Sequence, residues 1–451
     1  MLRKIRIAAA AFFFVLTTLL FLDFTGTLHA WFGWMAKIQF LPALLALNVG
    51  VVAFLVILTL LFGRVYCSVI CPLGVMQDIV SWASGKRRKH RNRFAYSPAL
   101  TWLRRGMLVV FVAAMLAGVG SLLAPYSAYG RIASNLLAPV YAWGNNLLAY
   151  IAGRMDSYAF YSVDVWMKSL STLLVAVVTF AVLFVLAWRS GRTYCNTICP
   201  VGTVLGFLAR YSLFKPRFDT SKCNGCKLCA RNCKASCIDP AAHKIDYSRC
   251  VACMDCLENC RQGAITYTLR RRKPDPAPAP QRPAADAAKT PSDASRRRFL
   301  GLAGIVAYSA LRAQEKKVDG GLAVIVDKKI PNRATPVVPP GAQSLRHFNA
   351  HCTGCQLCVS VCPNQVLRPS GKLMTLMQPE MSFERGYCRP ECTKCAEVCP
   401  TGAIRLTDLA GKSSIQIGHA VWIAENCEVN TDGVSCNNCA RHCPAGAIKM
   451  V

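Results

Sequence analysis

Four stretches in the N-terminal half of the chain are almost free of charge, at residues 7–22, 40–62, 107–123 and 170–188. A helix of about 20 apolar residues crosses the hydrocarbon core of a bilayer. The first and third stretches are a few residues short of that length, and the other two reach it. The pattern therefore predicts an α-helical membrane domain with four spans, at residues 1–214.

A further apolar stretch, residues 132–152, contains Pro139, Gly144 and a pair of asparagines. These residues interrupt the run of bulky apolar side chains that a spanning helix requires. We therefore expect this stretch to lie at the membrane surface, or to enter the membrane without crossing it.

Lysine and arginine are distributed unevenly among the loops. The loop between the second and third stretches carries nine of them, whereas the first loop carries only Lys37 and the third only Arg131, Arg154 and Lys168. Basic loops stay in the cytoplasm, and the N-terminus and the segment after Trp188 lie on the same side as this loop. We expect a multi-pass protein of a bacterial inner membrane.

The composition of the chain supports a membrane domain and shows an excess of positive charge. Apolar residues make up 53% of the chain, its mean hydropathy is +0.31 and its formal net charge is +30. Such a charge can indicate nucleic-acid binding. The basic loops and the compensation of anionic centres explain the charge here, so we expect no nucleic-acid partner.

The 25 cysteines fall into seven short clusters, and five of these have the spacing that holds cubane iron–sulfur centres. Three runs follow C-x2-C-x2-C-x3-C, the ferredoxin pattern in which the fourth cysteine of a run serves the neighbouring cluster. Two looser runs follow them. The candidate ligands are Cys223, Cys226, Cys229, Cys233, Cys250, Cys253, Cys256, Cys260, Cys352, Cys355, Cys358, Cys362, Cys388, Cys392, Cys395, Cys399, Cys427, Cys436, Cys439 and Cys443. Four thiolates per cubane predict five [4Fe-4S] centres.

Zinc and disulfides are the alternatives for these cysteines. Zinc sites usually combine two separated C-x2-C pairs, often with histidine, whereas three cysteines in steps of three wrap one corner of a cube. One position stays open at this stage. Cys237 follows Cys233 by four residues, and because neither precedes a proline, either can be the fourth ligand.

The remaining four cysteines belong to an internal repeat. Residues 63–74 (GRVYCSVICPLG) and 191–202 (GRTYCNTICPVG) agree at eight of twelve positions with an offset of 128. Spacing of four places both cysteines of a copy on one helical face. Cys67, Cys71, Cys195 and Cys199 are therefore candidates for a catalytic redox or metal site, and packing at helix ends is the alternative.

Two segments separate the cysteine-rich regions. Residues 271–294 are rich in proline, alanine and charge, which predicts a flexible linker. Residues 295–315 begin with Ser-Arg-Arg-Arg-Phe-Leu ahead of a short apolar run, which predicts an internal twin-arginine export signal at Arg296 and Arg297. The expected result is a cytoplasmic two-cluster domain at residues 215–270 and a periplasmic three-cluster domain at residues 316–451.

Other cofactors are disfavoured. The chain has no C-x2-C-H motif for covalent haem, and none of its seven histidines lies in the four stretches. It also lacks a glycine loop of the kind that cradles nucleotide phosphates. Quinone is the better candidate for a membrane partner. The expected fold is multi-domain, a helical membrane part with α+β ferredoxin-like domains on both sides of the membrane.

Two C-x3-C-P motifs followed by a ferredoxin domain resemble NapH, a membrane quinol dehydrogenase component. The twin-arginine segment, Pro339-Pro340-Gly341-Ala342, Phe348 and the run ending at Pro363 resemble NapG and MauM, exported ferredoxins. The resemblance implies a NapH–NapG fusion that passes electrons from the quinol pool to a periplasmic reductase or cytochrome. Two alternatives are a FixG-like copper reductase in oxidase assembly and a polyferredoxin subunit of a larger dehydrogenase.

Overall fold

The computed structural model describes residues 1–86, 93–118, 122–165, 167–269, 335–372, 375–384, 386–418, 420–443 and 446–449. The chain divides into two compact units. The first comprises Met1–Pro274 with Pro336–Gly418, and the second comprises Asp275–Thr335 with His419–Val451. The predicted linker and the twin-arginine segment lie outside the described residues.

Two helices in the described part of the chain are long and apolar enough to cross a membrane. They are α1 (Leu2–Leu22) and α11 (Leu170–Ser190), each of 21 residues. At 1.5 Å per residue, each is about 30 Å long, which matches the thickness of a bilayer core. These helices coincide with the first and fourth predicted spans.

The second and third predicted spans form shorter helices. The second stretch divides into α4 (Phe40–Leu45) and α5 (Val49–Phe62), because Leu47 adopts a φ of 53° and Asn48 caps the first turn of α5. The third becomes α8 (Thr101–Leu116), of 16 residues. Four membrane spans therefore remain a prediction.

This part contains further helices besides α1, α4, α5, α8 and α11. They are α2 (Thr27–Phe32), α3 (Trp34–Lys37), α6 (Val65–Val69), α7 (Pro72–Gly85), α9 (Pro125–Ile132), the π-helix η3 (Ala133–Leu137), α10 (Ala138–Arg154), α12 (Thr193–Thr197) and α13 (Pro200–Ala209).

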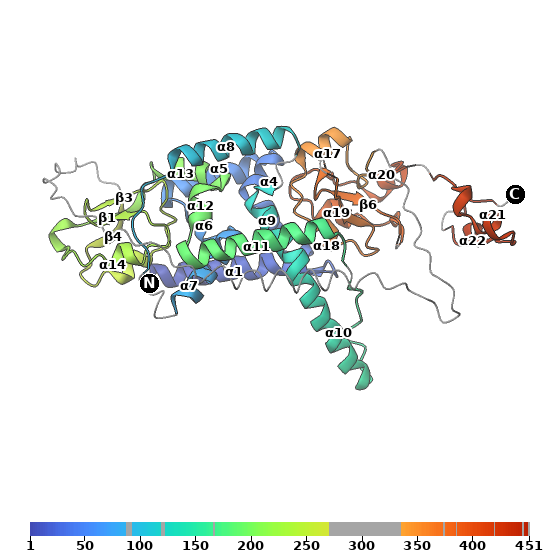
Figure 1. Cartoon of the computed structure of the whole chain (residues 1–451), viewed down its shortest axis with the longest axis horizontal. Helices are drawn as coiled ribbons and strands as arrows, with labels where there is room; N and C mark the ends of the chain where they lie inside the picture. The colour runs from blue at the N-terminus through green and yellow to red at the C-terminus, as the bar shows by residue number, and fades with distance from the viewer. Residues whose placement is uncertain are drawn as a thin grey trace, which may run out of the picture. The chain divides into compact units, whose positions relative to one another are not determined.

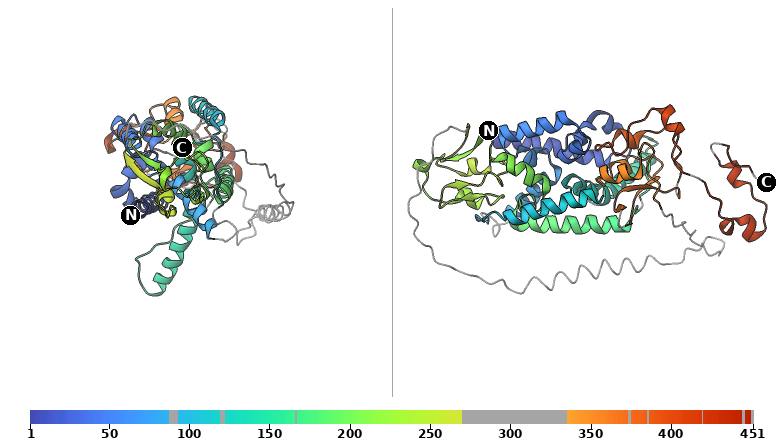
Figure 2. Two further views of the ribbon diagram at one scale, coloured as in Figure 1. Left: turned by 90° about the vertical axis from the view of Figure 1, so that its left-hand side faces the viewer. Right: turned by 90° about the horizontal axis from the view of Figure 1, so that it is seen from above.

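Helix α10 contains most of the interrupted apolar stretch and has no buried residue. It is nevertheless continuous, and Pro139 lies at its second residue, directly after the π-helix η3. Figures 1 and 2 show α10 leaving the neighbouring helices at a steep angle. The position of this stretch relative to a membrane stays a prediction.

The first cysteine-rich domain is a small α+β fold. Its outer sheet pairs β1 (Phe214–Phe218) with β4 (Ile265–Leu269) in antiparallel register. A second ladder pairs β2 (Ile238–Asp239) with β3 (Lys244–Ile245). The one-turn helices η4 (Thr220–Lys222), α14 (Leu228–Arg231) and α15 (Asp255–Asn259) complete it.

The second cysteine-rich domain occupies residues 336–418 of the same unit. Its sheet pairs β5 (Leu367–Pro369) with β6 (Pro379–Met381). Its helices are α17 (Leu345–His351), α18 (Leu357–Ser360), α19 (Lys394–Glu397) and α20 (Leu409–Ser414). Gly341 has a φ of 94°, and a side chain there would meet the Arg405 carbonyl, so the Pro-Pro-Gly-Ala segment forms a tight turn against this domain.

These two domains contact opposite ends of α1. Near the start of α1, Arg3 Nε donates to Asp255 Oδ1 at 2.8 Å in the first domain. Beyond its other end, the Thr25 carbonyl accepts from Lys394 Nζ at 3.0 Å in the second domain. Figure 1 shows α1 running between these two domains of the first unit.

Helix α11 runs the other way between the same two domains. Just before its start, Lys168 Nζ donates to the Val359 carbonyl at 3.2 Å in the second domain. Just after its end, the Arg192 amide donates to the Lys234 carbonyl at 2.8 Å in the first domain. The helical bundle thus separates the two cysteine-rich domains by roughly the length of one spanning helix.

The second unit is described by itself. Within its described residues it contains η8 (Ala424–Asn426), α21 (Glu428–Asp432) and α22 (Asn438–Arg441).

Candidate functional site

The eight tightly spaced cysteines of the first domain line two cavities. One, of about 300 Å³, is lined by Cys223, Cys226, Cys229 and Cys260. The other is lined by Cys233, Cys237, Cys250, Cys253 and Cys256. Three cysteines of one run therefore meet the last cysteine of the other run, which is the crossed arrangement that two neighbouring cubanes require.

The loops between these cysteines share one backbone feature. The residue after the second cysteine of each tight run has a positive φ: Lys227 at 59°, Met254 at 63° and Gln356 at 66°. Non-glycine residues seldom adopt this conformation. Here it turns the backbone sharply between the second and third cysteines, in all three runs that the sequence assigned to the ferredoxin pattern.

Cys233 and Cys237 lie side by side in the second cavity. Their sulfur atoms are 3.5 Å apart and both residues are buried. Either thiol can donate a hydrogen bond to the other, and such a bond lowers the pKa of the thiol that accepts it. Either cysteine can therefore be the fourth ligand, with the other placed to donate a hydrogen bond to it.

The second domain repeats the crossed arrangement. Cys362 lines one cavity with Cys388, Cys392 and Cys395. Cys399 lies instead with Cys352, Cys355 and Cys358, where burial is the main cause that raises their pKa values and charge at Cys399 adds to it. The tight run and the looser run thus exchange their last cysteines.

The fifth run belongs to the second unit. Cys427 precedes α21, and Cys439 lies in α22 and is exposed, whereas Cys436 and Cys443 are partly buried.

Thiolate-only donor sets in cavities of this kind suit a cubane, since soft sulfur ligands favour iron–sulfur centres. In the part of the chain that the structure describes, no three His, Cys, Asp or Glu side chains converge closely enough to hold one metal ion.

The two C-x3-C-P copies meet inside the helical bundle. Cys67, Cys71, Cys195 and Cys199 are at most 6% exposed and belong to one buried cluster, which we call the cysteine quartet. Each pair lies in a short helix and at the N-cap of the next one: α6 and α7 in the first copy, α12 and α13 in the second. The sequence repeat therefore brings both copies to a common site.

The arginine of each copy reaches across to the other copy. Arg64 Nη2 donates to the Cys195 carbonyl at 3.1 Å, and Arg192 Nη1 donates to the Cys67 carbonyl at 2.6 Å. Arg64 Nη2 is also 3.8 Å from Cys67 Sγ. Both arginines are fully buried. From the sequence, Arg64 counts among the basic residues of the loop after the second stretch, and neither arginine is predicted to be a site residue, although their recurrence in both copies of the repeat could have singled them out.

The two arginines differ in their acidic partners. Arg192 Nε donates to Asp78 Oδ1 at 2.7 Å. Arg64 has no carboxylate within ion-pair distance among the described residues, and its partners are Asn196, backbone carbonyls and Cys67. A buried cation without an anion is costly. The cysteine quartet therefore suits negative charge, in thiolates or in an anionic centre.

Glycine and proline in the repeat fix this geometry. Pro72 and Pro200 start α7 and α13, where proline is tolerated. A side chain at Gly202 would meet the Cys195 carbonyl and would lie 2.7 Å from Arg64 Nη2, and Gly74 has the same relation to Cys67 and Arg192. The glycines thus leave room for the crossing arginines.

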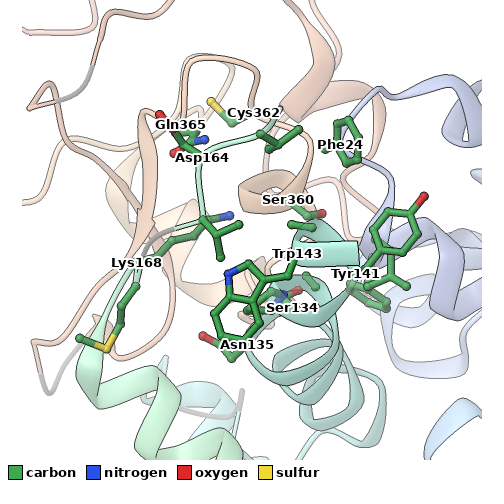
Figure 3. A pocket seen from close by; sticks show the side chains of 18 of the residues that line it. Phe24, Ser134, Asn135, Tyr141, Trp143, Asp164, Lys168, Ser360, Cys362 and Gln365 are labelled. Carbon is green, nitrogen blue, oxygen red and sulfur yellow. The ribbon is translucent and has the colours of Figure 1, made fainter. Parts of the chain in front are cut away.

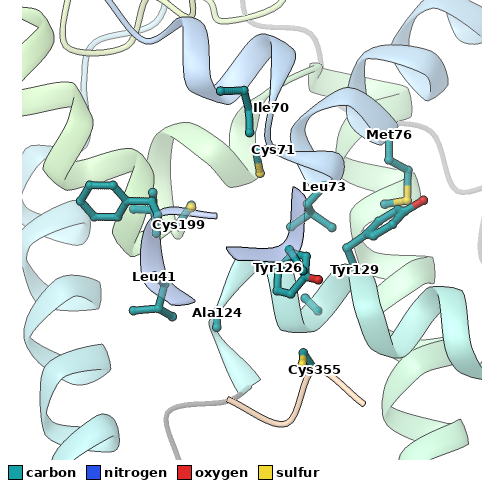
Figure 4. Packing of buried hydrophobic residues seen from close by; sticks show 14 of the residues in the cluster. Leu41, Ile70, Cys71, Leu73, Met76, Ala124, Tyr126, Tyr129, Cys199 and Cys355 are labelled. Atoms are coloured by element: carbon teal, nitrogen blue, oxygen red, sulfur yellow. The ribbon is translucent and has the colours of Figure 1, made fainter. Parts of the chain in front are cut away.

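A buried aromatic cluster lies between the cysteine quartet and the second domain. Figure 4 shows Cys71 and Cys199 on one side of Tyr126 and Cys355 on the other. Tyr126 is close enough to Cys355 and Cys399 to interact with their charge. On the opposite side, Arg64 joins the quartet to the first domain by donating to the Ser248 carbonyl at 3.1 Å.

Comparison with protein families agrees with these sites. A model described as a 4Fe-4S binding domain matches residues 44–90 and again residues 172–221, two segments with the same offset of 128 as the repeat. A 4Fe-4S dicluster domain matches residues 351–403, which include both runs of the second domain. The chain therefore carries ferredoxin-type [4Fe-4S] domains.

Similar curated proteins are ferredoxin-type proteins. The methylamine utilization ferredoxin-type protein MauN of Paracoccus denitrificans is 28% identical over 38% of this chain. MauM of Methylophilus methylotrophus, with the same description, is 33% identical over 25%. The ferredoxin-type protein NapH of Escherichia coli is 29% identical over 43%. The chain spans 48%, 50% and 55% of these relatives. No solved structure matches.

Proposed function

We propose that this chain takes electrons from membrane quinol and delivers them, through its cysteine-held centres, to a soluble periplasmic reductase or cytochrome. The observation that carries the proposal is the contact of two cysteine-rich domains with opposite ends of the apolar helices α1 and α11. Quinol is confined to the bilayer and the acceptor is not. A relay between them needs redox sites both beside apolar helices and in a domain outside them.

[4Fe-4S] centres, when bound, supply one-electron chemistry, and the protein tunes their potentials through hydrogen bonds, charge and burial. This chain offers such groups. Of Cys233 and Cys237, whose sulfur atoms are 3.5 Å apart, one thiol would donate to the other as a thiolate ligand, and Lys234 lies close enough to Cys253 to counter negative charge there. Both features favour the more negative, reduced state of the nearby centre.

The cysteine quartet is the proposed link between the two domains. Arg64 connects it to the first domain, and the cluster around Tyr126 connects it to the second. The buried charge of Arg64 compensates a thiolate-held redox site. In this proposal both copies of the repeat contain a cysteine pair because the four cysteines form a redox site, and not because they pack at helix ends.

We place the second domain in the periplasm and the first in the cytoplasm. The basic loop supports this orientation. The twin-arginine segment supplies the route, because that pathway exports folded domains with their cofactors in place.

The proposal is tested with purified, cluster-loaded protein, an added quinol and a soluble dye as acceptor. Cys195→Ser keeps the size of the side chain but loses its soft ligand and redox chemistry, so electron delivery should fall to background. Ser68→Ala, beside Cys67 and equally buried, is the matched control and should retain delivery. Wild-type turnover in Cys195→Ser at normal iron content would return the quartet to a packing role.

A further inference from the structure

A cavity of about 700 Å³ lies where the helical bundle meets the second cysteine-rich domain. Its walls come from four separate segments: the end of α1, the π-helix with the start of α10, the loop before α11, and the loop that carries Cys362. Figure 3 shows Cys362 at one end of this cavity and Trp143 and Asn135 toward the other. We call it the Cys362 cavity.

We propose that the Cys362 cavity binds the head group of the quinol, an inference that rests on the proposed function and assigns its substrate a site. Pockets for small organic ligands measure about 300–1,000 Å³, are mostly apolar and contain a few convergent polar groups. The Cys362 cavity has that size, and it adjoins a cysteine that shares a second cavity with Cys388, Cys392 and Cys395.

Aromatic side chains form one wall of the cavity. The Phe24 ring lies 5.7 Å from Tyr161 and 6.3 Å from Tyr141, measured between ring centroids. Trp143 adds a further ring. Flat apolar rings pack well against the flat ring of a quinol.

Polar groups in the cavity suit the two oxygen atoms of a quinol. Ser134 Oγ is buried and has no hydrogen-bond partner among the described residues, and a ligand oxygen would satisfy it. Ser134 lies in the π-helix, a rare element that is frequent at functional sites. Its neighbour Asn135 donates to Gln356 Oε1 at 2.9 Å, which ties this wall to the residue that follows Cys355.

The cavity is also accessible from the apolar phase. Helix α1, whose end forms part of the wall, is one of the two helices apolar enough to cross a membrane in the described part of the chain. Helix α10 continues outward from the cavity with exposed apolar side chains, among them Val140, Leu147 and Ile151. A quinol with a long apolar tail can therefore enter along α1 and α10 without leaving lipid.

The redox step balances at this site. The quinol loses two electrons and two protons: both O–H bonds break and both C–O bonds become carbonyls. A [4Fe-4S] centre held by Cys362, Cys388, Cys392 and Cys395 would supply the oxidant. It would accept one electron at a time, and the soluble acceptor would reoxidise it after each of the two electrons. The protons leave to water past Asp164, an exposed carboxylate of the cavity wall.

The test uses the full-length, cluster-loaded protein and measures decylubiquinone binding by calorimetry, together with the attachment site of a photoreactive azidoquinone. Ala142→Trp fills the cavity and should weaken binding at least about tenfold. Ser134→Ala removes one hydrogen bond and should weaken it about threefold to tenfold. Ala149→Trp, on the same helix but outside the cavity lining, is the matched control and should bind as the wild type does.

Labelling of residues 134–143 or 161–168, lost in Ala142→Trp while the spectrum of the reduced centres is unchanged, would support the site. Undiminished binding in Ala142→Trp, or labelling near Cys67 and Cys199 instead, would overturn the site but leave the quinol function intact. No quinone binding by the wild-type protein would overturn both.

Discussion

At the residue scale, the recurring Gly-Arg-x-Tyr-Cys segment is explained by contacts between its two copies. Gly63 and Gly191 adopt φ values of 74° and 68°, which end the preceding helices and release the chain into the short cysteine helices. The arginine that follows each glycine then crosses to the other copy. A motif that seems local in sequence is thus maintained by packing between residues that are far apart in the chain.

We predict that Gly202→Ala destabilises the protein by about 1–3 kcal/mol, because the added methyl overlaps the Cys195 carbonyl and crowds Arg64. Thermal unfolding in detergent measures the effect. Gly106→Ala is the matched control, since nothing lies within 4 Å of a side chain there and alanine favours the helix. Equal unfolding temperatures for the two variants would show that the site where Arg64 crosses to the second copy of the repeat tolerates an added methyl group.

At the element scale, a charged network joins the first cysteine-rich domain to the bundle. Asp78 of α7 contacts Arg6 of α1 at 2.9 Å, Arg192 at 2.7 Å and Lys234 at 3.0 Å. Lys234 also contacts Asp255 at 3.0 Å. Burial would raise the pKa of Asp78, but Arg192 and Lys234 outweigh it and hold this pKa well below its usual range.

We predict that Asp78→Asn costs about 3–5 kcal/mol of stability at pH 7, because it leaves the fully buried Arg192 without its carboxylate partner. In the wild type the pKa of Asp78 is depressed on folding, so its contribution is present above the unfolded pKa of about 4 and is lost as the pH falls below that value. Unfolding in detergent from pH 3 to 7 measures both effects.

The stability of Asp78→Asn should depend less on pH between 3 and 7 than the stability of the wild type does, because the carboxylate that titrates is absent. Asp156→Asn, at an exposed loop position, should leave the profile unchanged. Parallel pH profiles for Asp78→Asn and the wild type would show that this carboxylate does not hold the domain in place.

At the scale of the whole molecule, the cysteine sites follow one another along the first unit, from the first domain through the quartet to the second domain. The fifth run belongs to the second unit. The four runs of the first unit should therefore form their centres without it.

We predict about twenty iron atoms in the full chain and about four fewer when the chain ends at Gly418, since each cubane holds four. Iron analysis of anaerobically purified protein measures the difference, and the reduced centres of the first unit should keep their spectra. A loss of eight or more iron atoms would mean that the first unit needs the second to form its centres.

We also predict that replacing both Arg296 and Arg297 by Lys leaves the second domain in the cytoplasm while the helical part still inserts. Lysine carries the charge but not the planar guanidinium group on which twin-arginine recognition depends. Protease treatment of spheroplasts measures the exposure of residues 340–451. Continued cleavage of the double variant from outside would show that these arginines are not an export signal.

The sequence by itself determined the chemistry of this protein, because cysteine spacing within a run is a local property of the chain. It also located the apolar helices α1 and α11 and the repeated cysteine pairs, which depend on composition and short-range periodicity. It did not show that α10 is continuous, since Pro139 follows a π-helix that no sequence periodicity predicts.

Only the tertiary structure decided which residues share a site. Cys399 joins Cys352, and Arg64 joins Cys195, across long stretches of chain whose approach depends on packing of the whole unit. The same holds for the Cys362 cavity, whose wall residues come from four segments that no periodicity connects. Burial also changes what Arg64 implies. Water would solvate its guanidinium group in an exposed loop, whereas in the core this positive charge needs a negative partner.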